Sequence, residues 1–147
     1  MKESNAALRK GISVILIVVL LLAAAAFFAL WQSEKRDTSA YEKMAQAGAA
    51  EAYRRFASYA EKGSDGDYWG GVAAFHTFYE AYSFLTEGRD KSANRAFCSE
   101  VYGSLLLSPE RSKAHIPEII DVVKVLSENV MDENGYVKMS ELRNVLK

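Results

Sequence analysis

The hydrophobic pattern divides this chain into a long apolar run near its N-terminus and a helical remainder. Residues 12–31 read ISVILIVVLLLAAAAFFALW, and Ser13 carries the only strongly polar side chain among them. A helix of this length spans about 30 Å, which is the thickness of the hydrocarbon core of a bilayer. Thirteen of the residues are Leu, Ile, Val or Phe, so insertion is favoured by about 4–8 kcal/mol. The run therefore predicts a transmembrane helix.

The length and the end of this run distinguish an anchor from a cleavable signal peptide. A signal peptide has an apolar region of about 7–15 residues and ends in small residues. This run is longer and ends in bulky side chains, so we expect a retained signal-anchor and a lipid bilayer as its first partner. The positions that mark the predicted span are Ile12, Leu16, Leu20, Phe27 and Trp31.

Basic residues beside the run predict its orientation. Residues 1–11 form a short basic tail, in which Arg9 and Lys10 directly precede the apolar run. Lys and Arg next to a span favour the cytoplasmic side. Within twenty residues of the run, the two flanks contain the same number of Lys and Arg residues. The predicted orientation therefore depends on the direct contact of Arg9 and Lys10 with the run. We expect a single-pass membrane protein with a cytoplasmic N-terminus and an extracytoplasmic C-terminal domain.

After a juxtamembrane linker at residues 32–38, apolar positions recur at helical spacing through residues 39–147. Helices are expected at about 39–62, 68–88, 92–107 and 117–131, with a short terminal helix near 140–146. Short connections favour antiparallel neighbours. The sequence thus predicts an all-α protein, in which one N-terminal transmembrane helix is followed by a small bundle of four to five helices.

The first of these helices has recognisable end signals and a narrow apolar face. Ser39 and Glu42 match a capping box, and Gly63 supplies a stop signal. Because only residues 32–38 intervene, a helix that continues the predicted membrane helix as a stalk is the alternative to a start at Ser39. Its apolar stripe contains Gly48 and several alanines. Such small residues predict that a neighbouring helix approaches closely.

The second helix carries a wide apolar arc that is rich in aromatic side chains. An arc of this width requires more than one neighbour, so we expect this helix at the centre of the bundle. Residues 53–84 hold ten of the fourteen aromatics that follow the predicted span. An aromatic core is the first interpretation, and apolar-ligand binding through residues 53–84 is an alternative. The candidate interaction surface comprises Tyr68, Trp69, Phe75, Tyr79 and Tyr82.

Residues 130–141 resemble the second part of an EF-hand calcium loop. The resemblance implies Asp132, Asn134 and Glu141 as oxygen ligands, Tyr136 as a backbone ligand and Gly135 as the turn. The first loop position, normally Asp, is Val130. Calcium- or metal-responsive sensing through this degenerate loop is therefore a second alternative, with weak metal candidates and no assigned metal site.

Charge and motif content limit the functional classes. Residues 32–147 hold 15 Lys and Arg and 18 Asp and Glu, a net charge of −3, which argues against nucleic-acid binding. No nucleophile elbow, P-loop or dinucleotide motif is present, and no catalytic residue or cofactor is assigned. We therefore expect a non-enzymatic interaction or assembly module whose partner is another membrane or envelope protein, or a second copy of the chain.

Overall fold

The computed structural model describes the backbone of residues 2–147 and the side chains of residues 19–31 and 38–147. Over this described backbone the chain consists of helices and short connections, so the predicted all-α class is confirmed. The helices are, in chain order, α1 (Lys2–Lys62), α2 (Asp65–Leu85), α3 (Ser92–Leu107), α4 (Pro109–Ala114), α5 (Ile116–Glu128) and α6 (Glu133–Leu146).

The chain divides into two compact units, Met1–Thr38 and Ser39–Lys147, and α1 contributes residues to both. Among the residues with described side chains, no helix contains an apolar stretch sufficient to cross a bilayer. Ile12 and Leu16 of the expected span lie outside those residues. The transmembrane helix at residues 12–31 therefore stays a prediction.

The start predicted for the first helix of the bundle is wrong, whereas its end is confirmed. Helix α1 runs through residues 32–38 without a break, so Ser39 does not begin a helix. In a continuous helix, the backbone N–H groups that a capping box would satisfy already have partners one turn back. At the other end, α1 stops at Lys62 and Gly63 adopts φ +67°, a left-handed conformation that glycine accommodates without strain.

Small residues bring α1 and α2 into close contact, as the sequence predicts. Ala45, Ala49 and Ala52 are fully buried on α1. A Cβ atom on Gly48 would lie 2.6 Å from the backbone nitrogen of Phe78 on α2. The two backbones therefore meet at a distance that leaves no room for a side chain.

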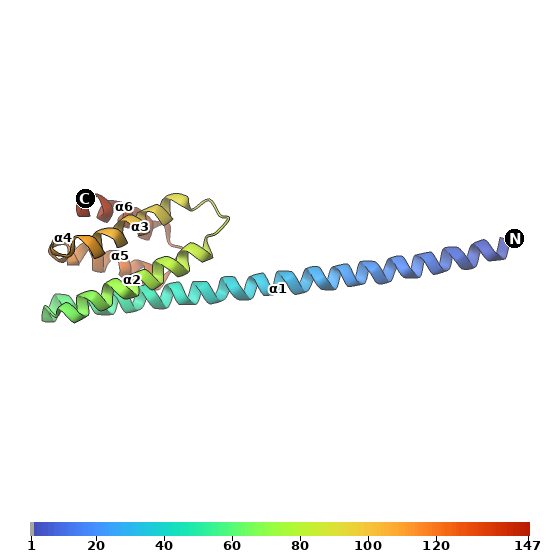
Figure 1. Cartoon of the computed structure of the whole chain (residues 1–147), viewed down its shortest axis with the longest axis horizontal. Helices are drawn as coiled ribbons and strands as arrows, with labels where there is room; N and C mark the ends of the chain where they lie inside the picture. Colours follow the sequence, from blue (N-terminus) through green and yellow to red (C-terminus); the bar gives the residue numbers. More distant parts are fainter. Residues whose placement is uncertain (1) are drawn as a thin grey trace. The chain divides into compact units, whose positions relative to one another are not determined.

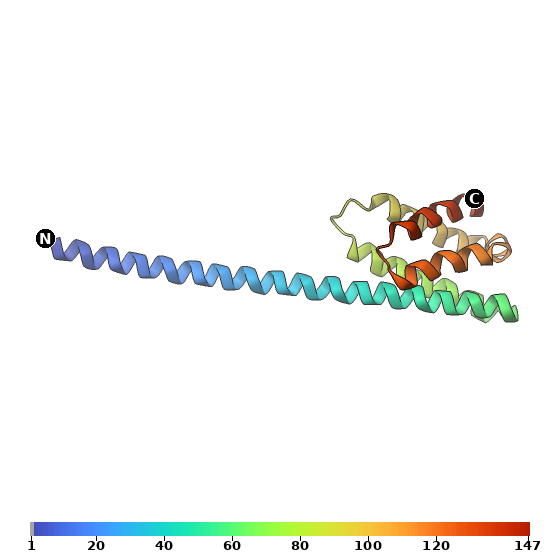
Figure 2. The same ribbon diagram turned by 180° about the vertical axis from the view of Figure 1, so that it is seen from behind.

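Helix α2 lies among several neighbours in the bundle. It packs on α1 at Gly48 and on α3 along its length, and the ring of Tyr82 stacks on that of Tyr136 in α6 at a centroid distance of 4.8 Å. Figure 1 shows α2 and α3 on the near side of the bundle, and Figure 2 shows α5 and α6 on the opposite side. The predicted need of α2 for more than one neighbour is confirmed.

The second half of the bundle follows the predicted order, and the helix-start signature at residues 108–110 opens a short helix between α3 and α5. Helix α3 has the predicted bounds, and the short α4 begins at Pro109, a residue suited to the first turn of a helix. Helix α3 packs on both α2 and α6, and α6 packs on α5. The bundle thus contains the last part of α1 and five further helices, rather than four to five helices in all.

Candidate interaction surface

Three of the five residues expected on an interaction surface lie in the core instead. Tyr68, Phe75 and Tyr82 are fully buried. Tyr79 is half-buried, and Trp69 is 43% exposed. The wide arc of α2 is therefore mainly a core face, and of these five residues only Trp69 and Tyr79 reach the surface.

The buried tyrosines have structural partners for their hydroxyl groups. Tyr68 Oη donates to the carbonyl oxygen of Leu105 at 2.7 Å, and Tyr136 Oη donates to that of Val130 at 2.6 Å. Burial raises the pKa of Tyr136 well above its usual range. These hydroxyls stay protonated and tie helices to backbone carbonyls, so they are core contacts rather than ligand groups.

A different surface emerges where α2 and α3 pack side by side. The α2–α3 face comprises Trp69, Ala73, His76, Tyr102 and Leu106. On α2, the first three are spaced by one helical turn each, and on α3 the last two are four residues apart, so each set lies on one side of its helix. The rings of His76 and Tyr102 join the two sets at a centroid distance of 4.8 Å. Trp69 and Leu106 are 43% and 44% exposed.

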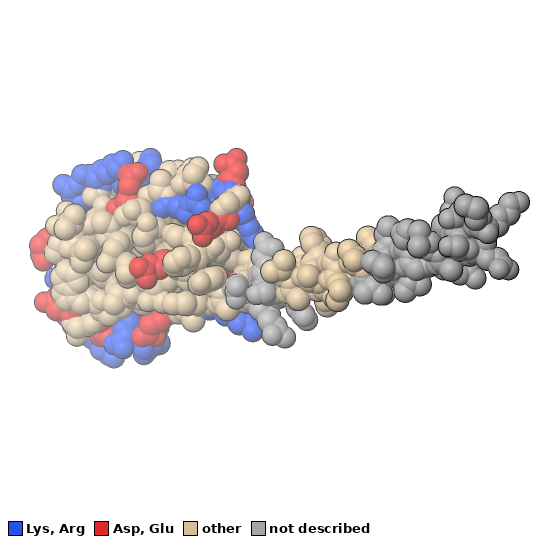
Figure 3. All heavy atoms as spheres, turned by 45° about the vertical axis from the view of Figure 1, so that its right-hand side comes forward, with Lys and Arg blue, Asp and Glu red and all other residues tan. Residues whose placement is uncertain are grey.

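The five residues of the α2–α3 face carry no Lys, Arg, Asp or Glu, and the carboxylate of Glu80, which lies 3.4 Å from His76 Nε2, borders the face at one end. Residues 68–79 on α2 and 101–107 on α3 contain no Lys, Arg, Asp or Glu. In Figure 3, Lys and Arg side chains gather mostly toward the edges of the unit, and Asp and Glu side chains also stand within the tan area between them. Depletion of charge together with exposed aromatic side chains is typical of the centre of a protein–protein interface.

In the segment that resembles a calcium loop, residues 130–132 form a turn and the residues from Glu133 onward are helical, so the predicted loop over residues 130–141 is wrong. Helix α6 begins at Glu133, and Asp132 caps it by accepting a hydrogen bond from the backbone N–H of Asn134 at 2.9 Å. Tyr136 is buried and Glu141 is exposed, both within the helix. The backbone at these positions is engaged in helical hydrogen bonds, which differs from the loop that an EF-hand requires.

Gly135 has a packing role rather than a turn role. A Cβ atom at this position would lie 2.6 Å from Cδ2 of Leu126 on α5. The glycine therefore allows α6 to pack closely on α5. The Asn134-Gly135 pair, a frequent turn dipeptide, lies here in the first turn of a helix.

The remaining reactive side chains do not converge on a metal or nucleophile site. Within the described part of the chain, no three His, Cys, Asp or Glu side chains are arranged to hold a metal ion. His76 Nε2 lies 3.4 Å from a carboxylate oxygen of Glu80, which makes an isolated pair. Cys98 is fully buried, and burial raises the pKa of its thiol far above the usual value.

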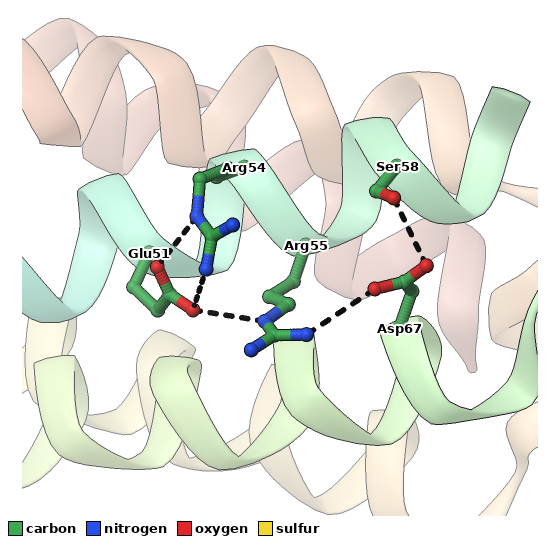
Figure 4. Close-up of polar contacts among 5 residues, drawn as sticks. All are labelled: Glu51, Arg54, Arg55, Ser58 and Asp67. Carbon is green, nitrogen blue, oxygen red and sulfur yellow. Dashed lines mark hydrogen bonds and ion pairs between the residues drawn. The ribbon is translucent and has the colours of Figure 1, made fainter.

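A charged network joins the ends of α1 and α2 close to the start of the α2–α3 face. Figure 4 shows Arg55 between two carboxylates: it donates to Glu51 at 2.8 Å and to Asp67 on α2 at 3.3 Å. Ser58 also donates to Asp67 at 2.9 Å. Arg54 donates to Glu51 from the other side. The network therefore links the last turns of α1 to the first turn of α2.

We predict that Glu51→Gln lowers the free energy of unfolding at neutral pH by about 1 kcal/mol or less, because this carboxylate is partly exposed and solvent screens it. Hydrogen bonds from Arg54 and then Arg55 lower the pKa of Glu51 from 4.5 to about 2. Since the pKa is lower in the folded chain, the stabilisation is present at neutral pH and is lost as the pH falls from about 4.5 to about 2.

Urea unfolding of the wild type and the variant, at neutral pH and near pH 2, measures this loss. The difference in unfolding free energy should shrink at the lower pH. An unchanged difference would show that the variant acts through packing rather than through charge.

The α2–α3 face could have been found from a different sequence signal. Residues 68–79 form a charge-free run within a chain in which a quarter of the residues are charged. The periodicity located the apolar arc of α2, but it could not tell which part of the arc the other helices cover. The charge-free run of α3 at 101–107, placed beside that of α2, identifies the uncovered part. Comparison with known proteins adds nothing to this picture, because no family model, curated protein or solved structure matches the chain.

Proposed function

We propose that this chain is a single-pass membrane protein whose helical unit, residues 39–147, acts as a protein-interaction or assembly module. The α2–α3 face is its binding surface, and its partner is another membrane or envelope protein or a second copy of the chain. The observation that carries the proposal is the uncharged α2–α3 face with Trp69 and Leu106 exposed. Contiguous exposed apolar surface of this kind marks interaction sites in soluble domains.

The proposed anchor is supported by the side chains of residues 19–31. The large apolar side chains in this range are exposed, and Phe27 and Leu30 are each more than 70% exposed. Covering such a side chain is worth about 1.5–3 kcal/mol. A lipid environment for residues 12–31 would supply that cover, and Arg9 and Lys10 favour a cytoplasmic N-terminus.

Binding rather than catalysis is the activity that the α2–α3 face supports. Its exposed groups are an indole, a phenol, an imidazole and aliphatic side chains, which supply contact area and hydrogen bonds at low entropic cost. The two other functions considered from the sequence gain no support. Of the candidate ligands of the calcium-loop alternative, Asp132 caps α6 and the others lie within it, and the largest rings of residues 53–84 fill the core.

Site-specific photo-cross-linking in intact cells tests the proposal. A photoreactive amino acid at Leu106 should give a discrete product of higher mass, which mass spectrometry identifies as a second copy or a different protein. The matched control carries the same amino acid at Ala50, an exposed position on α1, and should give none. Both variants should remain in membranes washed with alkaline carbonate, and a reporter fused after Lys147 should be extracytoplasmic.

The two halves of the proposal can fail separately. Release of the full chain by carbonate would refute the anchor. Equal products from both positions, or no product from Leu106, would refute the α2–α3 face as the binding surface.

A further inference from the structure

Two shallow grooves flank α6. The α5–α6 groove has a volume of about 260 Å³, and Val122 and Leu142 contribute to its apolar lining. The α3–α6 groove has a volume of about 290 Å³, and Phe97 and Tyr136 contribute to its lining. Glu141 lines both grooves. Each groove thus combines apolar lining with a carboxylate that the two share.

The charged groups that line the grooves are almost all acidic. Glu118 and Asp121 line the α5–α6 groove, and Glu133 lines the α3–α6 groove. Lys138 is the one basic side chain among the lining residues, and it is paired with Asp121. Lys91 pairs with Glu133.

Within the described part of the chain, neither Glu118 nor Glu141 is paired with a Lys or Arg, in contrast to Asp121 and Glu133. Glu118 has His115 beside it at 3.5 Å, whereas Glu141 has no ion-pair partner among the described residues. It is exposed on α6 between Val137 and Val145, each four residues away, and these valines are 57% and 44% exposed. The ridge of α6 therefore presents an unpaired carboxylate between two uncovered apolar side chains.

We infer that the two grooves form a docking site for a basic segment of a partner protein, which places one Arg or Lys side chain in each groove. The aliphatic stem of each side chain lies on the apolar lining, and its cation faces the carboxylates around Glu141. Arg and Lys combine an apolar stem with a charged head in this way. The grooves lie on opposite sides of α6, so the two cations are about 10 Å apart, the width of a helix. Positions i and i+7 of a partner helix give that spacing.

Charge decides between this occupant and the others. A second copy that docked through the same ridge would place Glu141 against its own counterpart, and like charges repel. Nucleic acids and anionic lipid headgroups carry the same sign as the grooves. The site is also separate from the α2–α3 face, because no residue of that face lines either groove. It therefore holds or fails independently of the proposed function.

Fluorescence anisotropy with purified full-length chain in a nonionic detergent tests the inference. The probe is a labelled helical peptide of Ala and Leu with Arg at positions i and i+7. It should bind saturably, and the same peptide with Gln at both positions should not. Glu141→Lys should weaken binding by about tenfold or more, since it places a cation opposite both arginines. The matched control, Glu61→Lys, makes the same change in net charge at an exposed residue that lines neither groove and should alter affinity by less than about twofold.

Two results would overturn the inference. Equal weakening by Glu141→Lys and Glu61→Lys would show that only the net charge attracts the peptide. Equal binding of the Arg and Gln peptides would show that the carboxylates do not contribute to recognition. Because Glu141 is exposed and makes no contact that the fold requires, circular dichroism of its variant should match that of the wild type.

Discussion

Replacing Phe78 with alanine should lower the free energy of unfolding by about 3–5 kcal/mol, the usual cost of deleting a buried ring. Phe78 is fully buried on α2, with its ring centroid 5.5 Å from that of Phe75 and 5.9 Å from that of Tyr82. Its backbone also lies against Gly48 of α1. The cavity would therefore open where two helices meet, and close backbone packing would limit its collapse.

Phe84→Ala is the matched control for this substitution. Phe84 lies on the same helix but is 56% exposed, and its ring stacks on Tyr41 at a centroid distance of 5.2 Å. Its loss should cost about 1 kcal/mol or less. Urea unfolding followed by circular dichroism measures both values. Similar losses for the two variants would show that Phe78 is not buried more deeply than Phe84.

Gly48→Ala is expected to destabilise the bundle by about 1–3 kcal/mol, although alanine favours a helix over glycine by about 1 kcal/mol. The added Cβ would lie 2.6 Å from the backbone nitrogen and 2.9 Å from the Cα atom of Phe78. Neither atom belongs to a flexible side chain, so relief requires α1 and α2 to move apart. The steric cost therefore exceeds the gain in helix propensity.

Gly103→Ala provides a control with the opposite sign. Gly103 lies within α3, and a Cβ atom there would meet nothing within 4 Å. Only the propensity gain remains, so this variant should be stabilised by about 0.5–1 kcal/mol. Thermal unfolding of the two variants beside the wild type measures both changes. A stabilised Gly48→Ala variant would contradict the close approach of α1 and α2.

The sequence was most informative where local signals and tertiary packing agree. The bounds of α3 follow from its apolar stripe and from Pro109 two residues after its last residue, because a proline favours a helix start over a helix interior. The close approach at Gly48 follows from the small residues of its stripe. In these cases the residues nearby in sequence carry the physical cause.

Where the cause lies far along the chain, local signals were misleading. Ser39 and Glu42 form a capping box only if a helix starts there, and the preceding helix supplies the partners instead. Asn134 and Gly135 form a common turn pair, yet Leu126 on α5 determines what Gly135 does. Burial of Tyr68 and Tyr82 likewise depends on α3 and α6. An arc drawn on one isolated helix contains none of this information.

The position of Cys98 has a consequence for the redox behaviour of the chain. Its thiol is enclosed by the bundle and stays protonated, whereas alkylation, oxidation and disulfide exchange all proceed through an accessible thiolate. A chain that carries its one cysteine in this way can enter an oxidising compartment without forming mixed disulfides while it is folded. Misfolded molecules lose that protection, so oxidative cross-linking would mark them selectively.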